Sequence, residues 1–462
     1  MKDTAFGPVF DTVLEGIGKT PMVRISKIDT GPCELFLKLE SNNPGGSIKD
    51  RIGLAMIEQA EKDGKLKPGG AIVEATAGNT GLALALVAAQ KGYKLIIVVP
   101  DKMAQEKIFH LKALGADVRL TRSDVGKGHP EYYQDVAEAI SRETGAFYVN
   151  QFGNEANPFA HETQTGPEIW GQMEEDMDAI VAGVGSGGTI AGLTHFFEKA
   201  APDVEIILAD PKGSILADYV NTGVKPNEVG SWLVEGIGED FIPDVADLSH
   251  VKKAYAITDK ESFEAARDLL REEGVLGGSS SGTIFAAALK YCREQKEKKR
   301  VVAFVCDRGD KYLSKMFNDY WMYDQGFLKR PPKGDLTDLI SRRHSEHATV
   351  TVKPDDTLMA AWGRMKLYDI SQLPVLNGDG TLAGIIDEED ILFAVVRDRE
   401  KFQEPVQSAM TYRVETLEAT EPMEELLPVF AKGHVAVVMT DGKFEGLITR
   451  TDLLNYLRLQ VA

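Results

Sequence analysis

The feature that most constrains the fold is the alternation of short apolar strand-like segments with helical segments. The strand-like segments are AIVEA (71–75), KLIIVV (94–99), DAIVAGV (178–184), VEIILAD (204–210) and VVAFV (301–305). Helical patterns between them begin near Gly81, Ala104 and Thr189. Apolar β-formers that alternate with helices are typical of parallel sheets covered on both faces. Residues 1–328 are therefore predicted to form an α/β domain built on open parallel sheets.

The rest of the chain follows a different pattern. The segment KRPPKGDLTDLISRRH (329–344) is rich in prolines and basic residues, which predicts a linker. Beyond it, LPVLNGDGTLAGIIDEEDIL (373–392) and VAVVMTDGKFEGLITRTDLL (435–454) form an ungapped repeat with an offset of 62 residues. Each copy is predicted to be a hairpin followed by a helix. Two copies, placed at 345–399 and 403–462, would bury their open faces against each other in one small α+β tandem domain; two unrelated hairpins are the alternative.

Composition narrows the class of function. The formal net charge of −19 argues against nucleic acid as the main partner, since phosphate binding needs a basic surface. The three cysteines are widely separated and have neither metal-site nor disulfide-framework spacing. No apolar run is long enough to span a bilayer, and the start, MKDTAFGPVFDT, has no apolar core of a secretion signal. We expect a cytoplasmic protein with no metal site and no membrane partner.

Three glycine-rich turns join strands to helices in the first domain: EATAGNTG (74–81), AGVGSGGTIAG (182–192) and GGSSSGT (277–283). The second contains G-x-G-x-x-G, and Asp210 ends the next strand, which matches a dinucleotide-binding fingerprint. The same loop is also a compact cradle for a single phosphate, with successive N–H groups at a helix N-terminus. A tight turn without any ligand is the third interpretation.

Lys49 stands in the first turn of a predicted amphipathic helix, after a Pro-Gly-Gly loop and the candidate N-cap Ser47. A cation is disfavoured there because the helix N-terminus carries partial positive charge. A solvated surface lysine would merely tolerate this field. A lysine that forms Schiff bases would benefit from it, because a positive field lowers the amine pKa and favours the neutral, reactive form. Together with a phosphate cradle, such a lysine favours pyridoxal phosphate as the cofactor.

The motifs resemble the β-family of pyridoxal phosphate enzymes, which includes cystathionine β-synthases and cysteine synthases. The matching segments are GKTPMVRI (18–25), NPGGSIKDR (43–51), ATAGNTG (75–81), GVGSGGTI (183–190) and GGSSSGT. The resemblance implies a two-subdomain, tryptophan-synthase-β-like fold for residues 1–328. The tandem repeat resembles a CBS-domain pair, also called a Bateman module.

The resemblance also implies roles for individual residues. Lys49 resembles the catalytic Schiff-base lysine, Asn79 the asparagine that hydrogen-bonds the cofactor's phenolic oxygen, and Ser279 the residue that faces the pyridine nitrogen. The phosphate loop corresponds to Gly185, Ser186, Gly187, Gly188 and Thr189. The substrate-binding positions correspond to Thr76, Ala77, Gly78, Thr80, Gln151, Phe152 and Gly238. A neutral serine does not hold the pyridine nitrogen protonated, which favours expulsion of a β-substituent, to give an enzyme-bound aminoacrylate to which a thiol adds.

Two reactions fit this chemistry. The segments DPKGSIL (210–216), WLVEGIGEDFIP (232–243) and NQFGNEANPFAH (150–161), and the CBS-like tail, resemble the cystathionine β-synthases, which join serine to homocysteine. In contrast, TQTGPEIW (163–170) resembles the cysteine synthases, which join O-acetylserine to sulfide, and Ala77 and Phe152 each lack a hydroxyl found in relatives. The first reaction is expected and the second is the alternative. The haem-binding extension of animal relatives has no counterpart before Gly18, so no haem is expected.

The tandem repeat suggests regulation. CBS pairs often bind adenosine-containing ligands through [ST]-x-x-D, which Thr449 and Asp452 match. The first copy has Asp387 in place of the hydroxyl, and an extra carboxylate would repel an anionic phosphate. S-adenosylmethionine is therefore favoured over ATP at the second copy. The other hypothesis is that the module binds nothing and drives oligomerisation, for which the resemblance implies at least a dimer. A nicotinamide dehydrogenase and a non-catalytic nucleotide sensor are the rival classes of function.

Overall fold

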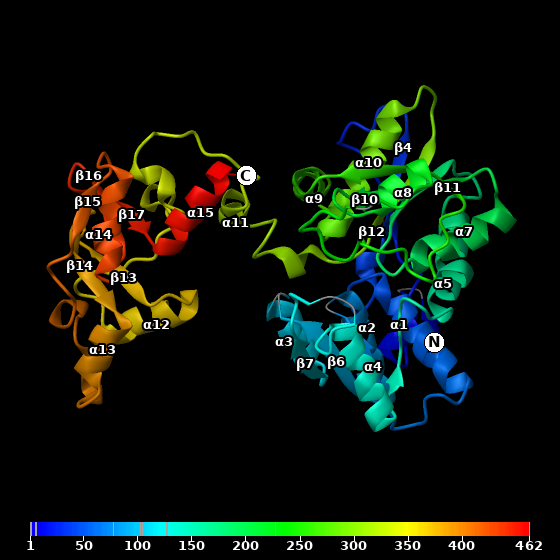
Figure 1. Cartoon of the computed structure of the whole chain (residues 1–462), viewed down its shortest axis with the longest axis horizontal. Helices are drawn as coiled ribbons and strands as arrows, with labels where there is room; N and C mark the ends of the chain where they lie inside the picture. The colour runs from blue at the N-terminus through cyan, green and yellow to red at the C-terminus, as the bar shows by residue number, and fades with distance from the viewer. Residues whose placement is uncertain are drawn as a thin grey trace. The chain divides into compact units, whose positions relative to one another are not determined.

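The computed structural model describes residues 2–4, 7–76, 78–101, 103, 105–125, 128–226 and 228–461. The chain divides into two compact units, residues 1–317 and 318–462 (Figure 1). The first unit holds two mainly parallel sheets, and the second holds the internal repeat.

The larger sheet of the first unit has six strands in the order β11-β10-β9-β12-β4-β3. All neighbours are parallel except β3, which pairs antiparallel with β4. The strands are β3 (Met22–Arg24), β4 (Glu34–Leu39), β9 (Ala179–Gly183), β10 (Glu205–Pro211), β11 (Val251–Ile257) and β12 (Arg300–Val305). The apolar central strands are buried because helices cover them, including α7 (Gly188–Ala200), α9 (Asp259–Glu273) and α10 (Ser279–Glu294).

The smaller sheet has four parallel strands in the order β7-β6-β5-β8. They are β5 (Ala71–Ala75), β6 (Lys94–Pro100), β7 (Asp117–Thr121) and β8 (Phe147–Tyr148). Its helices are α1 (Lys49–Lys62), α2 (Asn79–Lys91), α3 (Gln105–Ala113) and α4 (Tyr133–Thr144). Helices α1 and α2 approach closely because Gly53 lies against Ala83, and a Cβ atom at Gly53 would come within 2.8 Å of the alanine Cβ. The predicted α/β class with parallel sheets is confirmed, and the five predicted strands all form within one residue of their expected ends.

The second unit contains two hairpins that match the internal repeat. Strands β13 (Gln372–Leu376) and β14 (Leu382–Asp387) form the first, and β16 (Ala436–Thr440) and β17 (Lys443–Ile448) form the second. Helices α13 (Glu388–Val395) and α15 (Arg450–Val461) follow them. The predicted contact between the two copies is present: Leu376 of the first packs with Val437, Met439 and Phe444 of the second.

The segment predicted as a linker, 329–344, contains a 3-10 helix at Leu336–Leu339. Leu336, Leu339 and Ile340 are buried in the core of the second repeat. Their i, i+3, i+4 spacing places three apolar side chains on one side of the turn, so the segment is anchored to this unit.

Candidate active site

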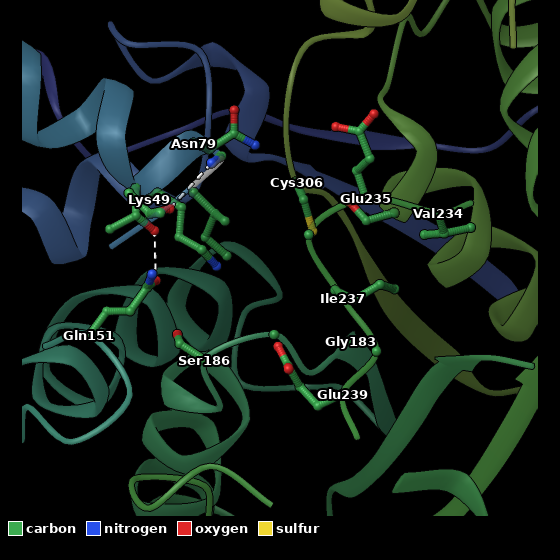
Figure 2. Close-up of a pocket in the computed structure, with 18 of the residues that line it drawn as sticks. Lys49, Asn79, Gln151, Gly183, Ser186, Val234, Glu235, Ile237, Glu239 and Cys306 are labelled. Atoms are coloured by element: carbon green, nitrogen blue, oxygen red, sulfur yellow. Dashed lines mark hydrogen bonds between the residues drawn. The ribbon is translucent and has the colours of Figure 1, made fainter. Parts of the chain in front are cut away.

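A cavity of about 330 Å³ lies in the first unit, at the carboxyl ends of strands β5, β6, β9 and β12 (Figure 2). Ligands of open parallel sheets bind at this edge, where the loops after the strands converge. Most of the residues predicted to form a site meet here. Those that line the cavity are Lys49, Thr76, Gly78, Asn79, Thr80, Gln151, Phe152, Gly185, Ser186, Gly187, Thr189 and Gly238.

Lys49 lies in the first turn of α1, as the sequence pattern predicted, and is its first residue; its side chain reaches the cavity. The N-cap is Ile48 and not Ser47, but the Ser47 hydroxyl still accepts the Lys49 backbone N–H at 3.2 Å. Burial lowers the pKa of Lys49, while the nearby Cys306, Asp307 and Glu239 act in the opposite direction. The cavity therefore favours the neutral amine, which is the nucleophilic form.

The turn between β9 and α7 forms the glycine-rich loop. Gly187 has a φ of +89°, a left-handed conformation that favours glycine. A Cβ atom at Gly188 would come within 1.9 Å of the Asn157 Oδ1, so only glycine fits beside that side chain. Asn157 in turn donates to the Ser186 hydroxyl at 3.0 Å and to the Gln151 carbonyl at 2.9 Å. The loop is thus held open at the N-terminus of a 13-residue helix, where backbone N–H groups suit an anion.

Asp210 does not fit the dinucleotide interpretation of this loop. Its side chain is fully buried, its Oδ2 accepts the Ala217 N–H at 2.8 Å, and it is not among the residues that line the cavity. Burial raises the pKa of Asp210 to about 6. The aspartate anchors the segment before α8 (Leu216–Thr222) and has no access to a ribose.

The loop after β5 forms the opposite wall. The Thr80 hydroxyl donates to Gln151 Oε1 at 2.7 Å, which ties this loop to the segment 150–161. The Asn79 amide is held at both ends: its Nδ2 donates to Asp307 at 2.9 Å, and its Oδ1 accepts from Lys311 at 2.7 Å. Ala77 lies outside the described residues.

Two predicted residues do not line the cavity. Gly188 packs against Asn157, as described above. The Ser279 hydroxyl accepts the Glu235 backbone N–H at 3.0 Å, at the start of α10, and its neighbour Ser280 lines the cavity. The role of Ser279 at a pyridine nitrogen stays a prediction.

Sequence reasoning missed two acidic residues of the wall, both within the segment WLVEGIGEDFIP. Glu235 is paired with Lys107 and Lys315. Glu239 has no ion pair or side-chain hydrogen bond among the described residues, and burial, with Asp240 and Asp210 nearby, raises its pKa to about 8 against the influence of Lys49. The sequence was informative here only through its likeness to relatives. Gly236 and Gly238, which lie between the two glutamates, indicate a special backbone but do not show which carboxyl group enters a cavity.

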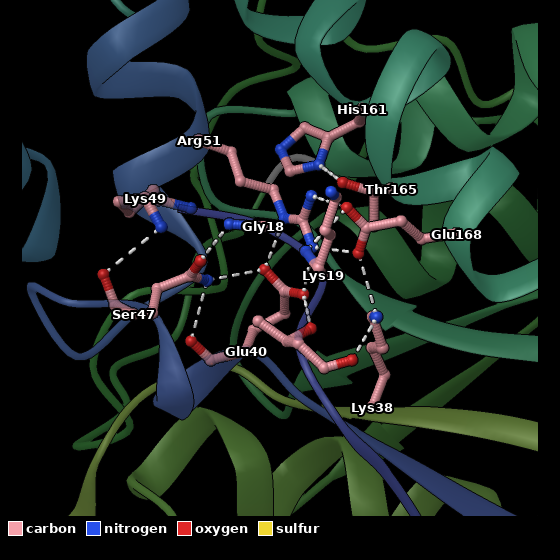
Figure 3. Close-up of polar contacts among 12 residues, drawn as sticks. Gly18, Lys19, Lys38, Glu40, Ser47, Lys49, Arg51, His161, Thr165 and Glu168 are labelled. Atoms are coloured by element: carbon pink, nitrogen blue, oxygen red, sulfur yellow. Dashed lines mark hydrogen bonds and ion pairs between the residues drawn. The ribbon is translucent and has the colours of Figure 1, made fainter. Parts of the chain in front are cut away.

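Beneath Lys49, a buried ionic network joins motifs that are far apart in sequence (Figure 3). Arg51 donates two hydrogen bonds to Glu40, at 2.7 and 2.8 Å, and two to Glu168, at 2.8 and 2.7 Å. Lys38 donates to Glu168 at 3.0 Å. Glu168 belongs to TQTGPEIW, the segment that resembles cysteine synthases, and none of residues 163–170 lines the cavity. Through Glu168 this motif therefore supports the start of α1 from outside the cavity.

In the second unit, Thr449 and Asp452 lie together at the start of α15. The Thr449 N–H and hydroxyl donate to Asp452 Oδ2 at 2.7 and 2.6 Å, and Ser341 donates to Oδ1. The carboxylate that was expected to bind an adenosine-containing ligand thus accepts hydrogen bonds from Thr449 and from Ser341 of the segment 329–344. In the part of the chain that the structure describes, no group of three or more His, Cys, Asp or Glu side chains is arranged to hold a metal. None of the described helices has the length and apolar character needed to cross a membrane.

Comparison with known proteins agrees with this geometry. Residues 13–307 match the pyridoxal-phosphate dependent enzyme family, and residues 340–397 and 406–459 each match the CBS domain. A cystathionine β-synthase of Apis mellifera is 36% identical over 469 residues, covering 99% of this chain and 92% of the relative. One from Mus musculus is 37% identical, covering 93% of this chain and 78% of the relative.

Among solved structures, a hydrogen sulfide-producing enzyme from Fusobacterium nucleatum is 38% identical with a TM-score of 0.61, covering 66% of this chain and all of its own. An O-ureido-L-serine synthase is 32% identical with a TM-score of 0.63, covering 68% of this chain and all of its own. The chain belongs to the cystathionine β-synthase family of pyridoxal-phosphate-dependent enzymes and carries a CBS-domain pair.

Proposed function

We propose that this enzyme replaces the β-hydroxyl of serine with homocysteine, giving cystathionine and water. The observation that carries the proposal is the position of Lys49. Its side chain lines the same cavity as the glycine-rich loop at the start of α7, whose backbone N–H groups suit a phosphate. The choice of substrates is supported by relatives of nearly full length that bear the name cystathionine β-synthase. The position of TQTGPEIW away from the cavity removes the main sequence feature that favoured cysteine synthase.

The residues present fit pyridoxal phosphate. The loop from Gly185 to Thr189 would hold the phosphate, Lys49 would hold the aldehyde carbon, and Asn79 would contact the phenolic oxygen. The buried Asn157 Oδ1 has no hydrogen-bond partner among the described residues, and it lies beside this loop. When bound, the cofactor supplies an electron-withdrawing ring that acidifies the α-hydrogen of an amino acid.

The protein's own groups would then perform three tasks. Thr76, Gly78 and Thr80, at the N-terminus of α2, would bind the substrate carboxylate, with Gln151 as a further contact. The Lys49 amine would remove the α-hydrogen as a general base. Because burial lowers the Lys49 pKa, more of the amine is in its basic form at a given pH than for an exposed lysine.

The test is a competition in which the purified enzyme receives serine, O-acetylserine, homocysteine and sulfide together, with products quantified by mass spectrometry. Predominant cystathionine with serine consumed is the expected result. Lys49→Ala should abolish turnover, whereas the control Lys62→Ala, at the other end of α1, should keep it. Predominant cysteine from O-acetylserine and sulfide would contradict the proposal and assign the alternative reaction.

For the tandem unit, we propose an adenosine-type ligand such as S-adenosylmethionine at Thr449 and Asp452, and an assembly of at least two copies. Calorimetric titration of the full chain tests the ligand. Because Ser341 occupies one oxygen of Asp452, Ser341→Ala should bind S-adenosylmethionine about fivefold more tightly, as expected from one hydrogen bond worth about 1 kcal/mol. No binding to either form would leave the module a role in assembly alone, and light scattering measures that assembly.

A further inference from the structure

Glu239 holds a position in the cavity wall that the proposed mechanism does not use. Its backbone is fixed: its N–H donates to the Ser214 hydroxyl at 3.1 Å, and its carbonyl accepts from that hydroxyl and from the Ile215 N–H, each at 3.1 Å. Gly238 before it has a φ of +89°. The segment DPKGSIL thus sets where this carboxyl group lies, and Figure 2 shows it turned into the cavity that Lys49 and Gln151 line from other elements.

The Glu239 carboxyl group is not engaged by other groups of the described chain. Only two acidic side chains, Glu235 and Glu239, are found among the described residues that line the cavity. Glu235 is committed to Lys107 and Lys315. No hydrogen bond or ion pair within the described chain engages the Glu239 carboxyl group, and the charged or titratable groups that influence it are Lys49, Asp210 and Asp240. With its pKa raised to about 8, Glu239 carries a proton at neutral pH.

The proposed reaction needs such a proton. Hydroxide is a poor leaving group because its conjugate acid, water, has a pKa of about 15.7 in bulk. The Lys49 amine takes the α-hydrogen, and a proton must return to Cα after the thiol adds. A separate acid in the wall would protonate the leaving oxygen while the Lys49 ammonium keeps its proton for that return. Lys107 is committed to Glu235, and burial raises the pKa of the Cys306 thiol to about 12, which makes it a weak acid. Burial also raises the pKa of the lining tyrosines, Tyr133 and Tyr312, so that, apart from the Lys49 ammonium, Glu239 is the acid of suitable strength in the described wall.

We propose that Glu239 is the general acid that protonates the β-oxygen of serine, an inference that rests on the proposed function. As the Cβ–O bond breaks, the oxygen keeps the bonding pair and takes the proton of the Glu239 carboxyl group, so that water leaves. The electron pair released at Cα by removal of the α-hydrogen forms the Cα–Cβ double bond. Glu239 is left as a carboxylate, which regains its proton from the thiol of homocysteine as the sulfur adds to Cβ.

The proposal predicts a dependence on the leaving group. Acetate leaves O-acetylserine without assistance, because its conjugate acid has a pKa of about 4, like other carboxylic acids. Glu239→Gln keeps the shape but has no transferable proton. It should lower kcat/KM for serine about 100-fold, within the range of general acid catalysis, and that for O-acetylserine less than about threefold. Glu239→Asp should recover part of the serine rate, and Asp244→Asn, which removes an exposed carboxylate that is not among the groups acting on Glu239, should leave the ratio of the two substrates unchanged.

A second readout follows the step before C–O cleavage. In deuterated water, Glu239→Gln should still exchange the α-hydrogen of serine, detected by mass spectrometry, although elimination is slow. Continued exchange would show that the variant is folded and binds serine. In the wild type, the serine rate should fall as the pH rises past about 8, and this limb should be absent in the variant.

The outcomes separate the two proposals. If the wild type consumes serine and Glu239→Gln slows serine and O-acetylserine equally, the general-acid role is refuted and the proposed function stands. An effect confined to the KM for homocysteine would also refute it and would assign Glu239 to thiol binding. A wild-type enzyme that does not consume serine would refute both.

Discussion

The buried ionic network beneath Lys49 allows a quantitative prediction for Glu40→Gln. The Glu40 carboxylate is fully buried and accepts four hydrogen bonds: two from Arg51, one from Thr20 at 2.6 Å and one from Asn43 at 2.9 Å. Together with Lys38 and Glu168, the network holds two cations and two anions. Glutamine preserves the volume, so no cavity forms, but the buried network acquires a net charge of +1.

Breaking a buried pair from one side costs about 3–5 kcal/mol, because the remaining charge is left without compensation. We expect about 3 kcal/mol for Glu40→Gln, at the lower end, since the amide oxygen still accepts from Thr20 or Arg51. The matched control is Glu34→Gln. Its partners Arg24 and Lys298, at 3.5 and 3.1 Å, both have exposed side chains, so the control should cost at most about 1 kcal/mol.

The assay is hydrogen exchange with mass spectrometry at increasing urea concentration, read on peptides that cover α1. This localised readout is needed because a chain of two units need not unfold in one transition. The α1 peptides of Glu40→Gln should lose protection at a clearly lower urea concentration than those of Glu34→Gln. Equal midpoints for the two variants would refute the reasoning, because the network would then contribute no more than a surface ion pair.

Two further predictions concern acid stability and the phosphate loop. Burial alone would raise the pKa of Glu168, but the hydrogen bonds and charge of Arg51 lower it to about 2. The stability that Glu168 contributes is therefore complete above its unfolded pKa of about 4.3 and is lost as the pH falls toward 2. In Glu168→Gln the melting temperature should fall less steeply over this pH range. An unchanged slope would contradict this prediction. In Gly188→Ala the new Cβ atom must displace Asn157, so the purified variant should lose most of the visible absorbance of bound cofactor. The control Gly171→Ala, which has open space around it, should keep this absorbance. Equal absorbance in the two variants would contradict the prediction.

Periodic patterns predicted the fold well. All five apolar segments became strands, because buried parallel strands need continuous apolar residues whatever their neighbours are. Strands β3, β4, β7, β8 and β11 were not predicted. In β7 the burial is incomplete: Asp117, Arg119 and Leu120 are exposed, which leaves no apolar run to detect. The segment 329–344 was interpreted from its prolines and basic residues, although its three apolar residues are the part that enters a core.

The candidate site was predicted where glycine or lysine at a turn signals a special backbone or reactivity, as at Lys49 and the loop from 185 to 189. It was missed where the function depends on a three-dimensional neighbour. Asn157 and Glu239 carry no local pattern, and their importance comes from contacts with residues 29 and 25 positions away, Ser186 and Ser214. Asp210 shows the opposite error. Its spacing from the glycine-rich motif indicated a carboxylate that binds a ligand, but the fold buries this carboxylate in a structural role.

The strand order of the larger sheet has a consequence for synthesis of the chain. Strand β12 lies between β9 and β4, so the pair β3–β4, made near the beginning, cannot join the rest of its sheet until residue 305 has been made. At typical rates of translation the interval between the ends of β4 and β12 is roughly 15 to 50 s. During that time the long edge of β4, with its apolar residues, is available for pairing with other chains. When many ribosomes translate the chain at once, unfinished chains should therefore aggregate through β4. The yield of folded protein should then depend on chaperones that cover strand edges, even if the folded protein is stable.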